Sequence, residues 1–189
     1  MARARVTSEN LIEAAAELAD EIGFDNVTVP ALARRVGVKD ASLYSRLAGA
    51  RELRVKIAVM ALGELADKVA EALAGRAGKD ALVAFANAYR DYAKQHPGRY
   101  AAMQLDLDPA TAEASAARRH SQMTRAILRG YQLDEPAETD AIRLLHGTFH
   151  GYVQLELAGR YDSHPRAVED SWARSLDALD ALLSNWPSA

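Results

Sequence analysis

Apolar residues recur at spacings of three and four along almost the whole chain, and no stretch alternates apolar with polar residues as a half-buried strand would. In the first such segment Leu11, Leu18 and Ile22 share one helical face, and Gly23 follows its end. The sequence therefore predicts an all-α protein. We expect nine helices, at about 9–22, 29–36, 40–47, 51–75, 79–95, 99–106, 110–129, 135–158 and 165–185.

The composition narrows the classes of protein that such helices can form. With 189 residues, of which 49% are hydrophobic, the chain can bury one sizeable core or two small ones. It contains no cysteine, which excludes disulfides, thiolate metal sites and a cysteine nucleophile, and a reducing cytoplasm is the expected location. No uncharged run reaches the roughly 18 residues that a membrane span needs, so we expect no membrane partner.

Charge is distributed unevenly along the chain. The formal net charge is -3, yet residues 1–60 hold nine Lys or Arg against eight Asp or Glu. The excess of acidic residues therefore lies in the remainder. If nucleic acid is the partner, the amino-terminal part of the chain is the part that meets it.

Residues 27–47, "VTVPALARRVGVKDASLYSRL", predict two short helices joined by a tight turn. Thr28 can cap the first helix, Pro30 is tolerated in its first turn, and Gly37 ends it. Polar and basic residues stand at the exposed start of the second helix. This pattern is typical of a helix-turn-helix that places its second helix in the DNA major groove, although many all-α proteins also join short helices at glycine.

Residues 8–60 resemble the amino-terminal domain of the TetR family of transcriptional regulators. In that family an apolar helix ends in Gly-Phe, a Thr opens the second helix, an Ala and a Gly-Val turn follow, and the third helix carries Leu-Tyr. The matching positions here are Gly23-Phe24, Thr28, Leu32-Ala33, Gly37-Val38 and Leu43-Tyr44.

The chain departs from the TetR pattern at three positions. Lys39 stands where the family usually has a capping Ser, and Leu47 where it has an aromatic residue. Ala50 stands where the family commonly has a Lys that contacts phosphate, and Arg46 and Arg51 lie close enough for either to replace that cation.

Residues 89–103 and 146–161 resemble the subtype of TetR carboxy-terminal domain that carries a Trp-x-x-x-His-Gly signature. Here His146 occupies the Trp position, and His150-Gly151 follows. The resemblance implies that the carboxy-terminal helices form a dimer and enclose a small-molecule pocket, and that ligand binding lowers operator affinity.

The resemblance implies a DNA-binding domain at residues 1–50 and a ligand-binding and dimerisation domain at 51–189. Asp40 can either cap the third helix or accept a hydrogen bond from a cytosine amino group. The basic start of the chain can reach a minor groove or have no role. The candidate DNA-binding residues are Arg3, Arg5, Thr28, Lys39, Asp40, Ser42, Tyr44, Arg46 and Arg51.

Aromatic and polar residues share one face of each of two predicted helices, at 79–95 and 135–158, which suits either a small-molecule cavity or an ordinary core. His146 and His150 have a spacing that can chelate a metal, but no third ligand is evident, and we expect neither a metal nor a cofactor. The candidate ligand-binding residues are Phe85, Tyr89, Tyr92, Met103, His146, Phe149 and His150.

Two features predict a dimer through the last two helices. Glycines at 147 and 151 allow helices to approach closely, and the last helix carries an apolar stripe that a chain of this size would struggle to cover. Packing of that stripe within the chain is the alternative. The candidate interface residues are Gly147, Gly151, Leu155, Trp172, Leu176, Leu179 and Leu183.

Together these features predict a cytoplasmic, homodimeric DNA-binding regulator, a repressor released from a pseudo-palindromic operator by a small-molecule effector. No paired-carboxylate, nucleophile-base or phosphate-loop arrangement indicates an enzyme. Two alternatives stay open at this point. One is a helical small-molecule-binding or catalytic protein without a DNA-binding role, and the other is a TetR-like activator.

Overall fold

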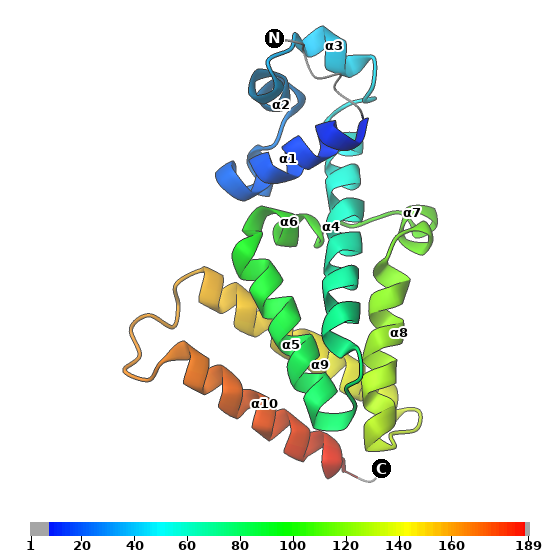
Figure 1. The fold of residues 1–189 in the computed structure, drawn as a ribbon, viewed down its shortest axis with the longest axis vertical. Coiled ribbons are helices and arrows are strands. Elements are labelled where there is room, and N and C mark those ends of the chain that lie inside the picture. Colours follow the sequence, from blue (N-terminus) through cyan, green and yellow to red (C-terminus); the bar gives the residue numbers. More distant parts are fainter. Residues whose placement is uncertain (1–7, 188–189) are drawn as a thin grey trace. The chain divides into compact units, whose positions relative to one another are not determined.

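The computed structural model describes residues 8–187, and all regular structure within that range is helical (Figure 1). This confirms the predicted all-α class. The structure has ten α-helices in the described range: α1 Ser8–Ile22, α2 Val29–Val36, α3 Asp40–Tyr44, α4 Ala50–Leu73, α5 Gly78–Gln95, α6 Pro97–Ala102, α7 Pro109–Ala114, α8 Ala117–Leu128, α9 Ala137–Leu157 and α10 Val168–Ser184. Two short 3-10 helices, η1 Phe24–Asn26 and η2 Arg129–Tyr131, complete them.

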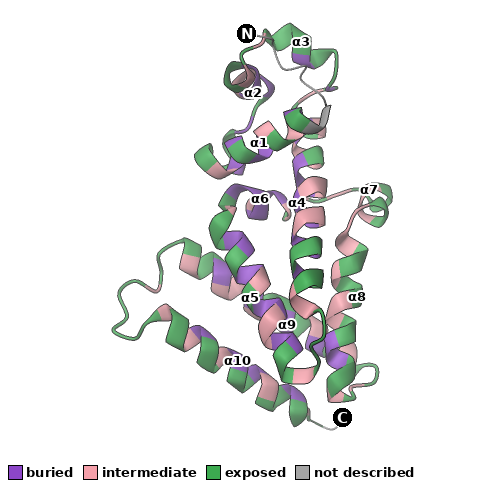
Figure 2. Cartoon of the chain, viewed as in Figure 1, coloured by how far each residue is buried: buried purple, intermediate pink, exposed green. Residues whose placement is uncertain are grey.

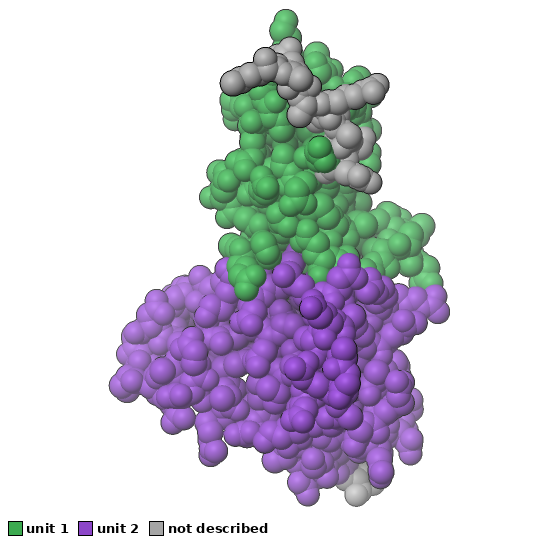
Figure 3. All heavy atoms as spheres, in the orientation of Figure 1, with its two compact units in different colours: residues 1–64, 95–117 green, residues 65–94, 118–189 purple. Residues whose placement is uncertain are grey.

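The chain forms two compact units, each made from two segments of sequence (Figure 3). Unit 1 comprises residues 1–64 and 95–117, and unit 2 comprises residues 65–94 and 118–189. Helix α4 contributes its first part to unit 1 and its last part to unit 2. The domain boundary predicted after residue 50 rests on sequence motifs, and it stays a prediction.

The helix-turn-helix forms as its local signals predict. The Ala31 N–H donates to Thr28 Oγ1 at 3.2 Å, so Thr28 caps α2, and Pro30 lies in the first turn. Gly37 ends α2 with φ 68°, a left-handed conformation that costs glycine little. The Val38 N–H then donates to the Ala33 carbonyl at 3.0 Å, which closes the end of the helix.

One apolar core holds α1, α2, α3 and the start of α4 together within unit 1 (Figure 2). Leu43 and Leu47 are buried in it, as predicted, and fix α3 against its neighbours. Each fully buried leucine contributes about 1.5–3 kcal/mol. The other large buried members are Leu11, Leu18, Phe24, Leu32, Leu53 and Ile57.

Several helices differ from their predicted bounds, and two of these differences have a local cause. Helix α3 ends at Tyr44, three residues early, where the Ser45 hydroxyl donates to the Ser42 carbonyl at 2.9 Å. The segment predicted as one helix over 110–129 is two, α7 and α8. Ser115 is extended between them, and its Oγ accepts from the Ala117 N–H at 3.2 Å, so a local cap overrides the helical propensity of the alanines.

In unit 2, α9 and α10 run in opposite directions and are joined by residues 158–167 (Figure 1). Each helix buries one stripe of side chains at helical spacing (Figure 2). These stripes are Ala141, Leu145, Phe149 and Val153 on α9, and Trp172, Leu176, Leu179 and Leu183 on α10. Within the described residues, no helix combines the length and apolarity that crossing a bilayer requires.

Candidate nucleic-acid interface and ligand-binding region

Helix α3 and its flanks present polar side chains to solvent. Lys39, Ser42 and Arg46 are exposed, and Tyr44 is 55% exposed despite its aromatic ring. The buried Leu43 and Leu47 of the same segment hold this face outward. Such a short, anchored helix with hydroxyl and cationic groups on its outer side has the form of a groove-reading helix.

The predicted capping of α3 by Asp40 is wrong. Helix α3 begins at Asp40 itself, so Lys39 occupies the N-cap position, and no side-chain hydrogen bond caps the helix. Asp40 is exposed in the first turn, where a carboxylate favours the positive end of the helix dipole. Its lack of a capping role follows from the register, because an N-cap residue must precede the first helical residue.

The remaining candidate DNA-binding residues lie around α3 in sequence. Thr28 is exposed at the start of α2, where its hydroxyl oxygen already accepts the capping hydrogen bond. Arg51 is exposed in the first turn of α4. Arg3 and Arg5 lie outside the described residues.

Two other cations of unit 1 are engaged by carboxylates. Arg35 contacts Glu17 at 2.9 Å and Glu21 at 2.6 Å, which ties α2 to α1. Arg54 contacts Asp25 at 2.5 Å, and its guanidinium lies over the Phe24 ring. The carboxylates neutralise both cations locally, so neither guanidinium can bind phosphate without giving up its partner.

Three of the candidate ligand-binding residues meet in unit 2. The Phe149 ring of α9 lies 6.1 Å from the Phe85 ring and 6.4 Å from the Tyr89 ring, both of α5. On its other side Phe149 lies 5.9 Å from Trp172 of α10, whose indole N–H donates to Asn87 Oδ1 at 2.8 Å. These side chains are called the Phe149 cluster below. It joins α5, α9 and α10, and the Trp172–Asn87 hydrogen bond adds a polar contact to it.

The other candidates are less closely associated. Tyr92 is fully buried in α5, whereas Met103 belongs to unit 1, at the end of α6. His146 is exposed and His150 is half-buried on α9; burial, and then the neighbouring His146, lowers the pKa of His150. Among residues 8–187 no group of three His, Cys, Asp or Glu side chains is placed to hold a metal.

Comparison with known proteins identifies this arrangement. The family model described as "Bacterial regulatory proteins, tetR family" matches residues 11–53, and that described as "Tetracyclin repressor-like, C-terminal domain" matches residues 82–179. The chain belongs to the TetR family. It is therefore a DNA-binding transcriptional regulator of the helix-turn-helix type, and the family is one of regulators rather than enzymes.

Individual relatives agree with this assignment. The chain is 34% identical over 161 residues to the uncharacterised HTH-type transcriptional regulator Rv0681 of Mycobacterium tuberculosis, covering 84% of this chain and 74% of the relative. It is 30% identical over 180 residues to the uncharacterised HTH-type transcriptional regulator YobS of Bacillus subtilis, covering 95% and 88%. A TetR variant from Acinetobacter baumannii, solved with minocycline, shares the fold with a TM-score of 0.72 at 19% identity, covering 98% and 100%.

The apolar stripe of α10 packs inside this TetR-family chain. Trp172 is 4% exposed, and Leu176, Leu179 and Leu183 are also buried. The chain therefore covers these four side chains itself, and the expectation that it could not is wrong. The exposed candidates are Gly147 and Leu155, the latter 47% exposed, and Gly151 is half-buried.

A buried arginine that sequence reasoning missed binds α6 to α1 and α4 in unit 1. Arg99 Nε lies 3.0 Å from Asp20 Oδ2, and its terminal nitrogens lie 3.0 Å from Glu13 and 2.8 Å from Glu64. Its backbone N–H also donates to Asp20 at 2.9 Å. Burial lowers the pKa of Arg99, but the carboxylates outweigh it and raise that pKa overall.

Gly98, beside this arginine, allows α6 to lie directly against α1. A Cβ at Gly98 would lie 2.0 Å from the Ala19 carbonyl oxygen, so no other residue fits without displacement. Residues 96–98, "HPG", fall between the helices predicted at 79–95 and 99–106. Glycine directly after the proline that opens a helix was the available signal of a close backbone approach.

A second missed arginine, Arg90 of α5, pairs with Glu156 of α9 through two contacts of 2.6 and 2.5 Å. Glu169 of α10 lies 3.3 Å away, and Lys94 contacts Glu156 at 2.9 Å. The Arg90 guanidinium also lies 5.5 Å from the Trp172 ring centre. This pairing joins the same three helices as the Phe149 cluster.

Proposed function

We propose that this TetR-family chain is a homodimeric repressor that a small molecule releases from its operator. The observation that carries the proposal is the exposed polar face of α3, anchored by buried Leu43 and Leu47. Residues 1–50 act as the DNA-binding domain and residues 51–189 as the ligand-binding and dimerisation domain. The regulator works in the cytoplasm, where its operator is accessible.

In this proposal α3 enters the major groove. Lys39, Arg46 and Arg51, whose side chains are exposed, supply cations to phosphates. Ser42 meets a base edge, since it stands between the flanking phosphate contacts. The other assigned contacts are the hydroxyls of Thr28 and Tyr44 with phosphate, Asp40 with a cytosine amino group, and Arg3 and Arg5 with the flanking minor groove.

The dimer forms through the exposed faces of α9 and α10. Leu144, Gly147, Gly151 and Leu155 follow one another at spacings of three and four on α9, and Leu182 is exposed on α10. Among residues 8–187, and leaving aside the backbone of α9 itself, nothing lies within 4 Å of a Cβ built at either glycine, so in this proposal the close approach that they allow is to a second copy. A two-fold dimer reads a pseudo-palindromic operator.

The effector binds beside the Phe149 cluster, with His146, His150, Tyr92 and Met103 as further contacts. A mostly apolar surface with a few polar groups suits a small, partly apolar molecule. The minocycline complex of the Acinetobacter TetR variant supports a small-molecule effector for this fold. His150-Gly151, within the matched carboxy-terminal region, supports the Trp-x-x-x-His-Gly subtype, and we assign no catalytic role.

Helix α6 gives the proposed response a route along the chain. One residue, His96, separates the end of α5 from the start of α6. Gly98 and Arg99 then fasten α6 to α1, so a shift at the end of α5 reaches the DNA-binding helices. A ligand that prefers one arrangement of α5 thereby changes DNA affinity.

Selection from a randomised duplex library with the full-length protein tests DNA reading. The proposal predicts enrichment of a two-fold-related pair of half-sites, and recovery without any enriched motif contradicts it.

Light scattering at micromolar concentration tests the dimer. The parent should have the mass of two chains and Leu155→Glu the mass of one, whereas Leu179→Glu, in the core, should unfold. A monomeric parent contradicts the dimer.

A further inference from the structure

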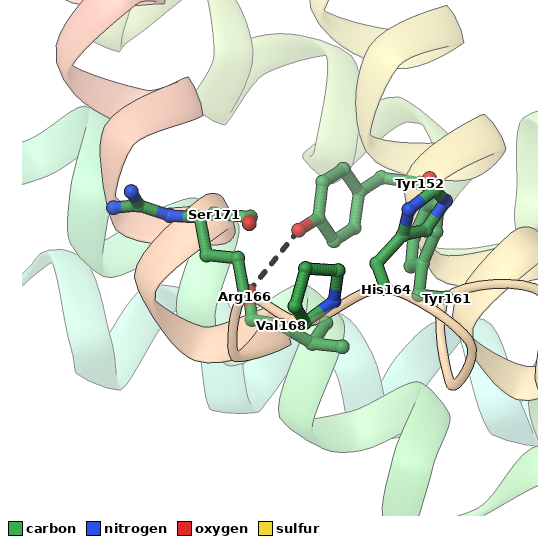
Figure 4. Close-up of a pocket in the computed structure, with 7 residues that line it drawn as sticks. Tyr152, Tyr161, His164, Arg166, Val168 and Ser171 are labelled. Atoms are coloured by element: carbon green, nitrogen blue, oxygen red, sulfur yellow. Dashed lines mark hydrogen bonds between the residues drawn. The ribbon is translucent and has the colours of Figure 1, made fainter.

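A cavity of about 350 Å³ lies in unit 2 at the junction of α9, the loop that follows it and the start of α10 (Figure 4). Tyr152 contributes the wall from α9, and Tyr161, His164 and Arg166 come from the loop. Ser171 closes it from the first turns of α10. The volume falls in the range of small-molecule sites, roughly 300–1,000 Å³.

One wall of the cavity is aromatic, and Trp172 packs against its Tyr152 ring. The ring centres of Tyr152 and Tyr161 lie 4.9 Å apart at 54°, and Tyr152 lies 4.8 Å from Trp172 at 58°. The Tyr152 hydroxyl donates to the Val168 carbonyl at 3.1 Å, shown as the dashed line in Figure 4. The ring is therefore held in place before any ligand arrives, which lowers the entropic cost of binding.

Two side chains of the lining can donate hydrogen bonds to an anion: His164, which lies beside Tyr161, and Arg166, on the side of Ser171 (Figure 4). Neither the His164 imidazole nor the Arg166 guanidinium has an ion-pair partner among the described residues. The nearby carboxylates of Glu156 and Glu169 are instead engaged by Arg90 and Lys94. In Figure 4 the Arg166 side chain extends past Ser171, with its guanidinium directed away from the two tyrosines, so this exposed side chain turns toward the cavity to meet a bound anion.

We propose that this cavity binds a small aromatic carboxylate. The ring packs against Tyr152 and Tyr161, and the carboxylate takes a charge-assisted hydrogen bond from Arg166 and a second hydrogen bond from His164. A planar carboxylate matches the fork of a guanidinium, whereas a neutral aromatic molecule leaves that fork unpaired. The site is built from different side chains than the Phe149 cluster, so it goes beyond the effector site proposed above.

Fluorine NMR of the full-length protein with 4-fluorobenzoate tests this site, and 4-fluorobenzyl alcohol serves as the neutral probe. The parent should bind the acid at least about tenfold more tightly than the alcohol, because only the acid can pair with Arg166. Arg166→Gln should remove that preference. Arg160→Gln is the matched control, since Arg160 is exposed on the same loop but does not line the cavity.

Two further variants place the binding on the aromatic wall. Tyr161→Leu should weaken both probes, whereas Phe149→Leu should leave both affinities within about twofold, since Phe149 does not line the cavity. Undetectable binding of the acid at millimolar concentration overturns the proposal. So does an equal affinity of the parent and Arg166→Gln for the acid. Arg166→Gln should keep full DNA affinity, so failure here is distinct from failure of the proposed repressor function.

Discussion

Two buried arginines fasten helices together in the two units, and they do so in different ways. The side chains of Arg99 in unit 1 and Arg90 in unit 2 are each 8% exposed. Arg99 is shared among three carboxylates from α1 and α4. Arg90 makes a two-contact pair with Glu156, which Lys94 also contacts.

The difference lies in what remains when the arginine is removed. Without Arg99, three carboxylates face one another with no strong cation between them. The neighbouring Gly98 packs so closely against the Ala19 backbone that there is no room for a side chain. Without Arg90, Lys94 still neutralises Glu156. The α6 junction of unit 1 is thus intolerant of change, which suits an element that must hold DNA-binding helices in place. The junction of unit 2 tolerates adjustment, which suits a ligand-binding region.

The largest effect is expected at Gly98. Gly98→Ala would press a methyl group against the Ala19 backbone, so α6 must leave α1 or unit 1 must distort. We expect a loss of several kcal/mol in the free energy of unfolding, at or above the usual 1–3 kcal/mol of overpacking. Gly63→Ala is the control, because Gly63 lies within α4 with no atom within 4 Å of its Cβ position.

Chemical denaturation of both glycine variants measures the difference. Gly63→Ala should be neutral or up to about 1 kcal/mol more stable, since alanine favours a helix. Equal stabilities of the two variants would show that α6 is not tightly seated, and the contrast between the units would then disappear.

The next largest effect separates the two arginines directly. Arg99→Met should lose about 3 kcal/mol of stability, the usual cost of leaving a buried charge without its partner, and Arg90→Met should lose less. The double variant Arg90→Met/Glu156→Leu should recover most of the Arg90→Met loss, because no unpaired carboxylate remains. A greater loss for Arg90→Met than for Arg99→Met reverses the comparison.

A smaller effect concerns acid sensitivity in unit 2. Burial raises the pKa of Glu156, but its hydrogen bonds with Arg90 and Lys94 outweigh this and lower that pKa overall. The pKa of His150 is lowered by burial and by His146. Both groups therefore contribute stability above their ordinary pKa values of 4.5 and 6.5, and that stability is lost as the pH falls through their depressed pKa values.

Thermal unfolding measured across this range tests the histidine alone. Between about pH 7.5 and 5.5 the parent should lose more stability than His150→Gln, because glutamine does not take up a proton. Glu156 contributes only at lower pH. If the stability of the two proteins falls equally over this pH range, protonation of His150 does not contribute to the acid sensitivity.

Local signals in the sequence predicted the helix-turn-helix well. Thr28 fixes the start of α2 through a side-chain hydrogen bond, and Gly37 fixes its end through a left-handed backbone conformation. The residue type at each position was therefore enough to predict where the helix begins and ends. Ser115 also caps locally, but the alanines around it masked the signal. Periodicity correctly predicted which face of α10 is apolar, yet it could not show what covers that face, so it left both a partner chain and packing within the chain open.

The arginine junctions had no comparable signal. Arg99 reaches Glu13 across 86 positions of sequence and Arg90 reaches Glu156 across 66, so no local spacing relates the partners. The aromatic faces of α5 and α9 were predicted, and they meet at Phe149. The cavity beside Tyr152 depends on how a loop returns to α10, which periodicity does not determine.

The central claim is that DNA is read by the exposed face around α3 and not by unit 2. Fluorescence anisotropy on the selected duplex, titrated with salt, tests it most directly for Lys39→Ala and Arg46→Ala, with the exposed Arg166→Gln of unit 2 as control. The account predicts that each of the first two weakens binding and lowers the slope of log affinity against log salt by about 2 per dimer, and that the control matches the parent. Unchanged affinity and slope in both Lys39→Ala and Arg46→Ala would contradict the account.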